Sequence, residues 1–187
     1  MRHLPLLLSW FLPAFIPLIW HGSDALLVSP HATAARFALV DDNGAVPIVS
    51  FAGDHEVVSI AVGDLASDIE RVTGRRPLVH RDPDEMPVHA VIVGTLGRSP
   101  LIDRLVTSGK LDASALRGSW ETFLIETMDA PLPGLERALV IAGSDRRGTV
   151  FGVYELSRAI GMSPWHWWAD ASRISTRSAC AASTTRT

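Results

Sequence analysis

The glycine-flanked stretch at residues 143–149 contains residue types that could bind an anionic ligand. It reads Gly-Ser-Asp-Arg-Arg-Gly-Thr and follows an apolar run. Helix N-termini bind anions, and Arg146 and Arg147 would add positive charge there. Thr149 stands where a phosphate-binding P-loop has its lysine, so the stretch is not a P-loop. The alternative interpretation is a tight strand-to-helix turn with two solvated arginines.

A dense aromatic segment near the C-terminus is the second candidate. Trp165, Trp167 and Trp168 lie within four residues, and Asp170 follows them. The flat indole faces could stack on sugar rings, and the carboxylate could accept hydrogen bonds from sugar hydroxyl groups. The same tryptophans could instead form a hydrophobic contact with another domain, which is also natural for this residue type.

The acidic residues do not form a convincing catalytic pair. Glycoside hydrolysis usually needs two carboxyl groups on either side of the scissile bond. Glu121 and Glu126 are five residues apart, which places them on opposite faces of a strand. Asp64 and Asp68 share a helix face, but Asp64 fits better as a helix cap. The histidines are scattered without ligand spacing, so we expect no catalytic residue, no metal site and no cofactor.

Composition excludes several classes of protein. The net charge of -3 gives no global basic surface, so no nucleic-acid partner is expected. Hydrophobic residues make up 47% of the chain and charged residues 20%, which indicates a packed core and not a disordered chain. Cys180 is the only cysteine, which excludes a disulfide framework and a cysteine-based zinc site within the monomer.

Residues 1–25 have the pattern of a secretory signal peptide. A short basic start precedes an apolar run at residues 4–20, and the small residues Ser23 and Ala25 follow. The apolar run is shorter than the roughly 20 residues that span a bilayer. We therefore expect a secreted, extracellular protein with no membrane association after cleavage. A signal anchor and a wrongly assigned start codon are the alternatives.

Residues 45–170 predict an α/β domain, preceded by an irregular segment at 26–44. Apolar runs indicate about five mixed strands in a single layer with helices packed on it. The strands are expected at residues 46–51, 57–62, 88–93, 120–128 and 138–142. The link at residues 129–134 is too short for a helical crossover, so the last two strands should be antiparallel neighbours.

Three helices are expected between and after these strands. The first follows Asp64 as its cap, and the second begins at the Ser99-Pro100 pair. The third covers residues 145–160, with Ser144 or Asp145 as its cap. Apolar residues cover much of its circumference, so we expect this helix to be buried on more than one side.

The predicted domain resembles the N-terminal region of glycoside hydrolase family 115. The resemblance is carried by the segments at residues 90–103, 120–125 and 137–157, and by residues 160–170 with their tryptophans. That family comprises xylan α-1,2-glucuronidases, which remove glucuronic acid or its 4-O-methyl ether from xylan. Its members have an N-terminal α/β domain, a (β/α)8 catalytic barrel and further C-terminal domains.

The resemblance implies that residues 45–170 are the non-catalytic N-terminal domain. The family's catalytic carboxylates lie in the barrel, so none is transferred to this chain. Xylan or glucuronoxylan oligosaccharide is the implied partner when the barrel is present. The candidate substrate-binding residues are Asp145, Arg146, Trp165 and Trp167. An arginine beside a helix N-terminus suits the carboxylate of glucuronic acid.

Residues 171–187 depart from the family pattern completely. They consist mainly of Ser, Thr, Ala and Arg and have neither helical nor strand periodicity. We interpret them as a disordered or out-of-frame tail. Three hypotheses follow, of which the first is an inactive N-terminal fragment of a secreted glucuronidase. The others are a secreted carbohydrate-binding module that uses residues 165–170 and a non-functional truncated product.

Overall fold

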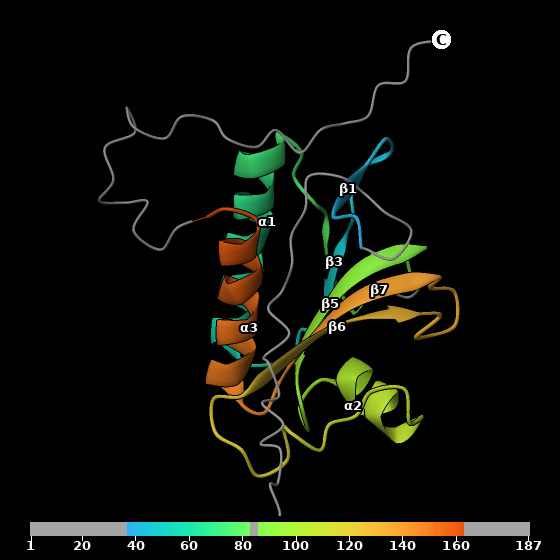
Figure 1. The fold of residues 1–187 in the computed structure, drawn as a ribbon, viewed down its shortest axis with the longest axis vertical. Coiled ribbons are helices and arrows are strands. Elements are labelled where there is room, and N and C mark those ends of the chain that lie inside the picture. Colours follow the sequence, from blue (N-terminus) through green and yellow to red (C-terminus); the bar gives the residue numbers. More distant parts are fainter. Residues whose placement is uncertain (1–36, 83–85, 163–187) are drawn as a thin grey trace, which may run out of the picture.

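A mixed five-stranded sheet forms the centre of the computed structural model, which describes residues 37–82 and 86–162 (Figure 1). Its strands are β3 (Ile48–Ser50), β4 (Val79–Arg81), β5 (His89–Thr95), β6 (Phe123–Asp129) and β7 (Arg137–Gly143). They lie in the order β4-β3-β5-β7-β6, and every neighbouring pair is parallel except β6 and β7. This confirms the predicted α/β class with a mixed sheet, and the antiparallel pair joined by the short link.

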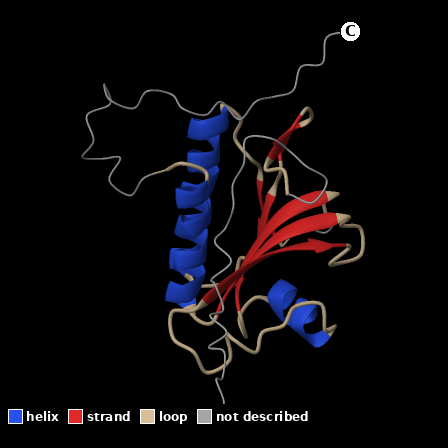
Figure 2. Ribbon diagram, viewed as in Figure 1, coloured by secondary structure: helices blue, strands red, loops and turns tan. Residues whose placement is uncertain are grey.

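Three helices cover the two faces of the sheet (Figure 2). α1 (Glu56–Thr73) and α3 (Arg146–Ala159) lie side by side on one face, and α2 (Pro100–Thr107) lies on the other. Successive residues of a strand point to opposite faces, so Val91 and Val93 of β5 pack with α1 and α3, whereas Ile92 packs with α2. Strands that are covered on both faces have nearly continuous apolar sequences, as β5 and β7 do.

α2 and α3 start where predicted, but only α3 has a side-chain hydrogen bond from its cap residue. Ser99 is the residue before α2, and Pro100 is its first residue, where the missing N–H costs nothing. Asp145, and not Ser144, caps α3 with its side chain. Both helix starts can be predicted from the sequence because the start of a helix depends on a few neighbouring residues.

The strand predicted at residues 57–62 is wrong, because these residues form the first turns of α1. The buried residues Val58, Ala61, Val62 and Leu65 recur at i, i+3, i+4 and i+7, which is one face of a helix. Their β-branched neighbours favour a strand locally, but packing of this face on the sheet outweighs that preference. The sheet has β4 as a strand instead of the segment at residues 57–62.

Asp64 lies inside α1 and does not cap it as predicted. Its carboxylate accepts a hydrogen bond of 2.8 Å from the Tyr154 hydroxyl group, which joins α1 to α3. Partial burial, and then the contact with Asp64, raise the pKa of Tyr154 to about 12. The phenol therefore stays protonated and donates this bond throughout the neutral pH range.

The outer side of α3 is exposed within the described residues. Gly152, Val153 and Leu156 are buried against the sheet and α1, whereas Phe151 and Tyr154 are 40% and 44% exposed. α3 therefore packs against two neighbours, the sheet and α1, and its outer side is exposed in this part of the chain. A row of apolar side chains is left in contact with solvent.

The segment expected to be irregular at residues 26–44 contains part of a small hairpin where the structure describes it. β1 (Val40–Asp41) and β2 (Gly44–Ala45) are antiparallel, and Phe37 and Leu39 pack against the core on the α1 and α3 side. The predicted signal peptide and the tail at 171–187 lie outside the described residues. Within residues 37–82 and 86–162, no helix is long and apolar enough to cross a membrane.

Substitution of Gly143 tests the packing at the end of β7. A Cβ atom there would lie 2.1 Å from the backbone nitrogen of Thr149, so Gly143→Ala forces the first turn of α3 to move. We expect the free energy of unfolding to fall by about 1–3 kcal/mol. Gly63→Ala is the matched control, because it lies inside α1 with no atom near the new Cβ. It should raise stability by about 0.5–1 kcal/mol. Urea unfolding followed by circular dichroism measures both, and similar values for the two variants would contradict this account.

Candidate functional site

The carboxyl ends of three parallel strands lie along one edge of the sheet, where the helices begin. α1 follows β3, α2 follows β5 and α3 follows β7. α1 and α2 leave this edge toward opposite faces of the sheet (Figure 2). Open α/β sheets bind ligands at this edge, at the point where successive connections leave in opposite directions. Asp145 and Arg146, which the sequence analysis proposes as site residues, lie at this edge of the sheet, directly after β7.

A buried polar network ties these strand ends together. The carboxylate of Asp54, after β3, accepts hydrogen bonds from the backbone nitrogens of Thr95 (2.8 Å) and His55 (2.7 Å). The hydroxyl groups of Thr95 and Thr149 lie 2.8 Å apart, which extends the network to α3. Buried polar networks of this kind fix a unique arrangement when every member is satisfied. The three loops therefore share one rigid frame.

Asp145 uses its carboxylate to organise the start of α3. One oxygen accepts from the backbone nitrogens of Arg147 (2.9 Å) and Gly148 (2.8 Å), and the other accepts from Glu121 (2.8 Å). The hydrogen bonds from Glu121 and then Gly148 hold the pKa of Asp145 below its ordinary value. The N-terminus of α3 is thus already occupied by a carboxylate of the chain itself. An external anion at this site would have to bind through side chains.

The two glycines of the 143–149 stretch are explained by packing. A Cβ atom on Gly148 would lie 2.3 Å from the carbonyl oxygen of Thr122, and one on Gly143 would collide with Thr149. The backbone nitrogen of Thr122 also donates to the hydroxyl group of Ser144 (3.1 Å). The stretch is therefore a tight strand-to-helix turn, held against the residues that precede β6.

The two arginines of this turn have different surroundings. Arg147 forms an ion pair with Glu121 (Nη1 to Oε1, 2.8 Å), and its guanidinium carbon lies 5.8 Å from the centre of the Phe151 ring. Arg146 is exposed, and the described residues provide it with no hydrogen bond or ion pair. Arg146 is therefore the cation of this turn that is available to a ligand.

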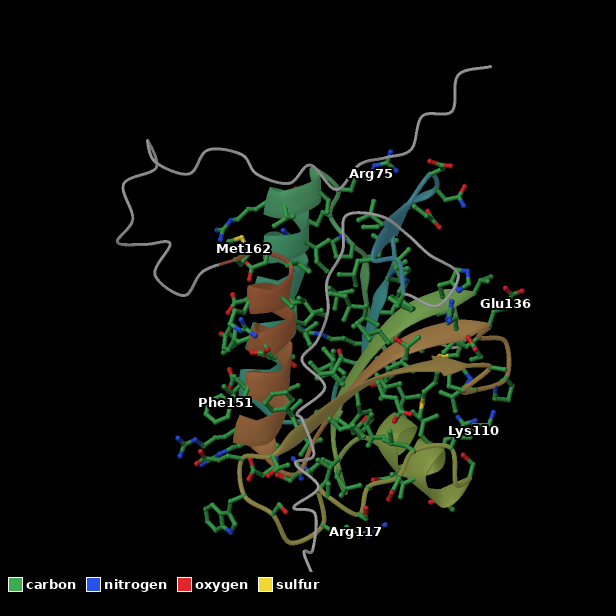
Figure 3. The ribbon with its side chains drawn as sticks, in the orientation of Figure 1. Arg75, Lys110, Arg117, Glu136, Phe151 and Met162 are labelled. Carbon is green, nitrogen blue, oxygen red and sulfur yellow. The ribbon has the colours of Figure 1, made fainter. Side chains whose placement is uncertain are left out.

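A surface depression of about 440 Å³ lies between the N-terminal ends of α1 and α3. We call it the α1–α3 depression, and it is lined by Val57, Arg146, Arg147, Val150 and Phe151. Phe151 projects from the outer side of α3 in Figure 3. Its lining combines apolar side chains with two guanidinium groups, and the guanidinium group of Arg147 is paired with Glu121.

Trp120 precedes Glu121, whose backbone nitrogen binds Asp145, and it is not among the candidate site residues predicted from the sequence. It is assigned to a predicted strand at 120–128, but β6 begins only at Phe123. Its side chain is 85% exposed, the highest value among the large hydrophobic residues described. Positive φ angles at Gly118 (73°) and Glu121 (54°), on either side of Trp120, interrupt the extended backbone before β6.

The remaining residues considered in the sequence analysis are two tryptophans and two glutamates. Trp165 and Trp167 lie outside the described residues, so their role in substrate binding stays a prediction. Glu126 is exposed on β6, whereas Glu121 is held by Arg147. Among residues 37–82 and 86–162, no group of three His, Cys, Asp or Glu side chains could hold a metal ion.

Asp145→Ala tests whether this carboxylate joins the turn to the residues before β6. The variant loses a helix cap and the bond to Glu121, so the free energy of unfolding should fall by about 1–2 kcal/mol. Because the pKa of Asp145 is lowered in the folded protein, the ionised carboxylate contributes fully to the free energy of unfolding above its ordinary pKa near 3.9. This contribution is lost progressively as the pH falls through the lowered pKa. The difference from wild type should therefore be constant between about pH 5 and 8 and shrink in acid. Asp42→Ala, in the exposed hairpin turn, is the control. A difference that does not change down to about pH 2 would contradict the assignment.

Comparisons with known proteins match the chain to solved structures. No protein-family model and no curated protein matches the chain. A solved structure with a similar fold is that of a family GH115 4-O-methyl-alpha-glucuronidase with specificity for decorated arabinogalactans. The TM-score is 0.51 and the sequence identity is 31%. The match covers 66% of this chain and 14% of that chain, so this chain corresponds to a small part of the glucuronidase. The comparison supports the resemblance to GH115 at the level of the fold.

Proposed function

We propose that this chain is the N-terminal, non-catalytic α/β part of a secreted glycoside hydrolase similar to the GH115 glucuronidases. The observation that carries the proposal is the structural match to a 4-O-methyl-alpha-glucuronidase at 31% identity. The proposed reaction of the whole enzyme is release of glucuronic acid or 4-O-methylglucuronic acid from a polysaccharide. This chain supplies a rigid support and one edge of the substrate site.

The glucuronic acid residue is the proposed point of recognition, and not a particular polysaccharide backbone. The sequence resemblance implies xylan, whereas the matched glucuronidase has specificity for decorated arabinogalactans. A uronic acid carries one carboxylate, and Arg–carboxylate hydrogen bonds are strong and directional. Arg146 offers this contact, and Asp145 acts through the backbone that positions Arg146. Trp165 and Trp167 are proposed to add contacts from the segment that follows.

The gene itself provides the test of the enzyme proposal. Sequencing of the transcript and genomic DNA from codon 160 past codon 187 should reveal a frame that resumes after Asp170 with barrel-like alternation of strands and helices. The product of that frame should release 4-O-methylglucuronic acid from glucuronoxylan or from a decorated arabinogalactan. The 187-residue chain should release none. A genuine stop after Thr187 with no such frame would overturn the proposal and leave xylan binding as the function to examine.

Export of the chain has a separate test. Expression in a secreting host should yield a protein whose mature N-terminus lies close to residue 26, because the small residues Ser23 and Ala25 suit signal peptidase. Mass spectrometry of the secreted protein locates the cut. Replacement of Leu6, Leu7 and Leu8 with Asp should abolish export, since the apolar stretch is required. A secreted protein that retains Met1, or an unchanged export of the triple variant, would count against a cleaved signal.

A further inference from the structure

We propose that the open edge of β6 pairs with β6 of a second copy of this chain, which joins two five-stranded sheets into one. β6 lies at the end of the strand order, with β7 as its neighbour (Figure 1). No other strand pairs with it among the residues that the structure describes. An unpaired strand edge is a template for the addition of another strand. The inference concerns assembly, so it does not depend on the catalytic activity of an extended gene product.

The backbone bonds at the two ends of β6 show which residues face the open side. The carbonyl oxygen of Thr122 accepts from the nitrogen of Ser144 (2.8 Å), and the nitrogen of Ala130 donates to the carbonyl oxygen of Glu136 (2.6 Å). In an antiparallel pair, residues that bond to the neighbouring strand alternate with residues that point away from it. The even-numbered residues of β6 therefore bond to β7. The backbone groups on the open side belong to Phe123, Ile125, Thr127 and Asp129.

β6 lacks the features that usually protect an exposed strand edge. Its sequence contains neither proline nor lysine, and its register with β7 continues over seven residues without a bulge. Leu124 packs on the α2 side and Ile125 on the side of α1 and α3, and both are only partly buried. Apolar side chains therefore lie beside the open backbone on both faces of the sheet. β4, at the opposite edge, has only three residues, and such a short edge resists strand addition.

β6 itself is the complement that this chain offers to the open edge. A partner strand needs a free edge of similar length, and β1, β2 and β4 have two, two and three residues. Two copies of β6 related by a two-fold axis run antiparallel, so each outward N–H can meet an outward carbonyl group. Closed dimers of this kind, in which the same surface is used by both copies, are the commonest oligomers. The pairing therefore requires no foreign segment.

Charge selects the register of this strand pair. With Glu126 on the two-fold axis, the two Glu126 carboxylates lie directly opposite each other, which is destabilising. With Ile125 on the axis, Ile125 meets its own counterpart, and Phe123 meets Thr127 of the second copy. Aromatic and β-branched side chains form favourable cross-strand pairs. A register centred on Leu124 also avoids the repulsion but pairs fewer residues. The proposed register therefore has Ile125 on the axis.

The mass of the chain in solution tests the inference. Analytical ultracentrifugation should show a shift from one copy to two as the concentration of the 187-residue chain rises. Thr127→Pro should weaken this association by about tenfold or more, because proline removes an outward N–H and its ring occupies the open side. Thr127→Ala is the matched control. It shortens the same side chain but keeps the N–H, so the dimer should remain.

A second proline variant separates loss of pairing from loss of folding. The N–H of Thr127 points away from β7, so Thr127→Pro should leave the domain folded. The N–H of Glu126 points toward β7, so Glu126→Pro removes a ladder bond and should lower the midpoint of thermal unfolding much further. Circular dichroism measures both variants.

Hydrogen exchange of the unmodified chain examines the same edge without any substitution. The even-numbered residues of β6 should be protected at every concentration, because they bond to β7. Asp129 should stay unprotected, because its counterpart Glu121 leaves the extended conformation with a φ of 54°. Protection that appears only when the dimer forms is expected at the amides of Phe123, Ile125 and Thr127.

Several outcomes would overturn the inference. One is a chain that remains a single copy at millimolar concentration, and another is a dimer that a folded Thr127→Pro variant retains. Protection of the outward amides that does not depend on concentration would assign the open edge to another segment of the same chain. A doubled mass with no added protection at Phe123, Ile125 and Thr127 would assign the dimer to a different surface.

Discussion

The carboxylate of Asp145 is the interaction on which the arrangement of the candidate site depends. It binds the first turn of α3 through Arg147 and Gly148, and it binds the segment before β6 through Glu121. These two parts of the chain are 24 residues apart, and the carboxylate makes them one unit. An asparagine could keep the two bonds to α3 through its single oxygen but would lose the bond from Glu121, because an amide group has only one acceptor atom.

Close backbone packing makes this unit rigid. Gly148 lets α3 approach the carbonyl oxygen of Thr122, and Gly143 lets the end of β7 pass Thr149. From Thr149 the hydroxyl contact with Thr95, and then the bond to Asp54, extend the same frame to the ends of β5 and β3. Such a frame fixes the backbone of these loops before any ligand arrives, which lowers the entropy lost on binding.

The sequence was sufficient where the structure is decided by near neighbours. The helix starts at Ser99-Pro100 and at Asp145 and the short link before β7 are local, and the predicted helix starts and antiparallel pair are confirmed. The strand predicted at residues 57–62 is wrong because their helical face is revealed by burial on the sheet and not by residue preference. The exposure of Trp120 could not be predicted either, because it depends on where β6 begins and on the bond between Glu121 and Asp145.

The antiparallel orientation of β6 has a consequence for how the residues around the start of α3 could diversify. Phe123 pairs with Gly143, so the segment that enters β6 emerges beside the segment that leaves β7. A connecting loop, residues 108–122, therefore lies beside the first turn of α3. Loops accept insertions and deletions more readily than helix starts do. Related chains could thus change the length and sequence of this loop and keep the turn at the start of α3, without any alteration of the central sheet.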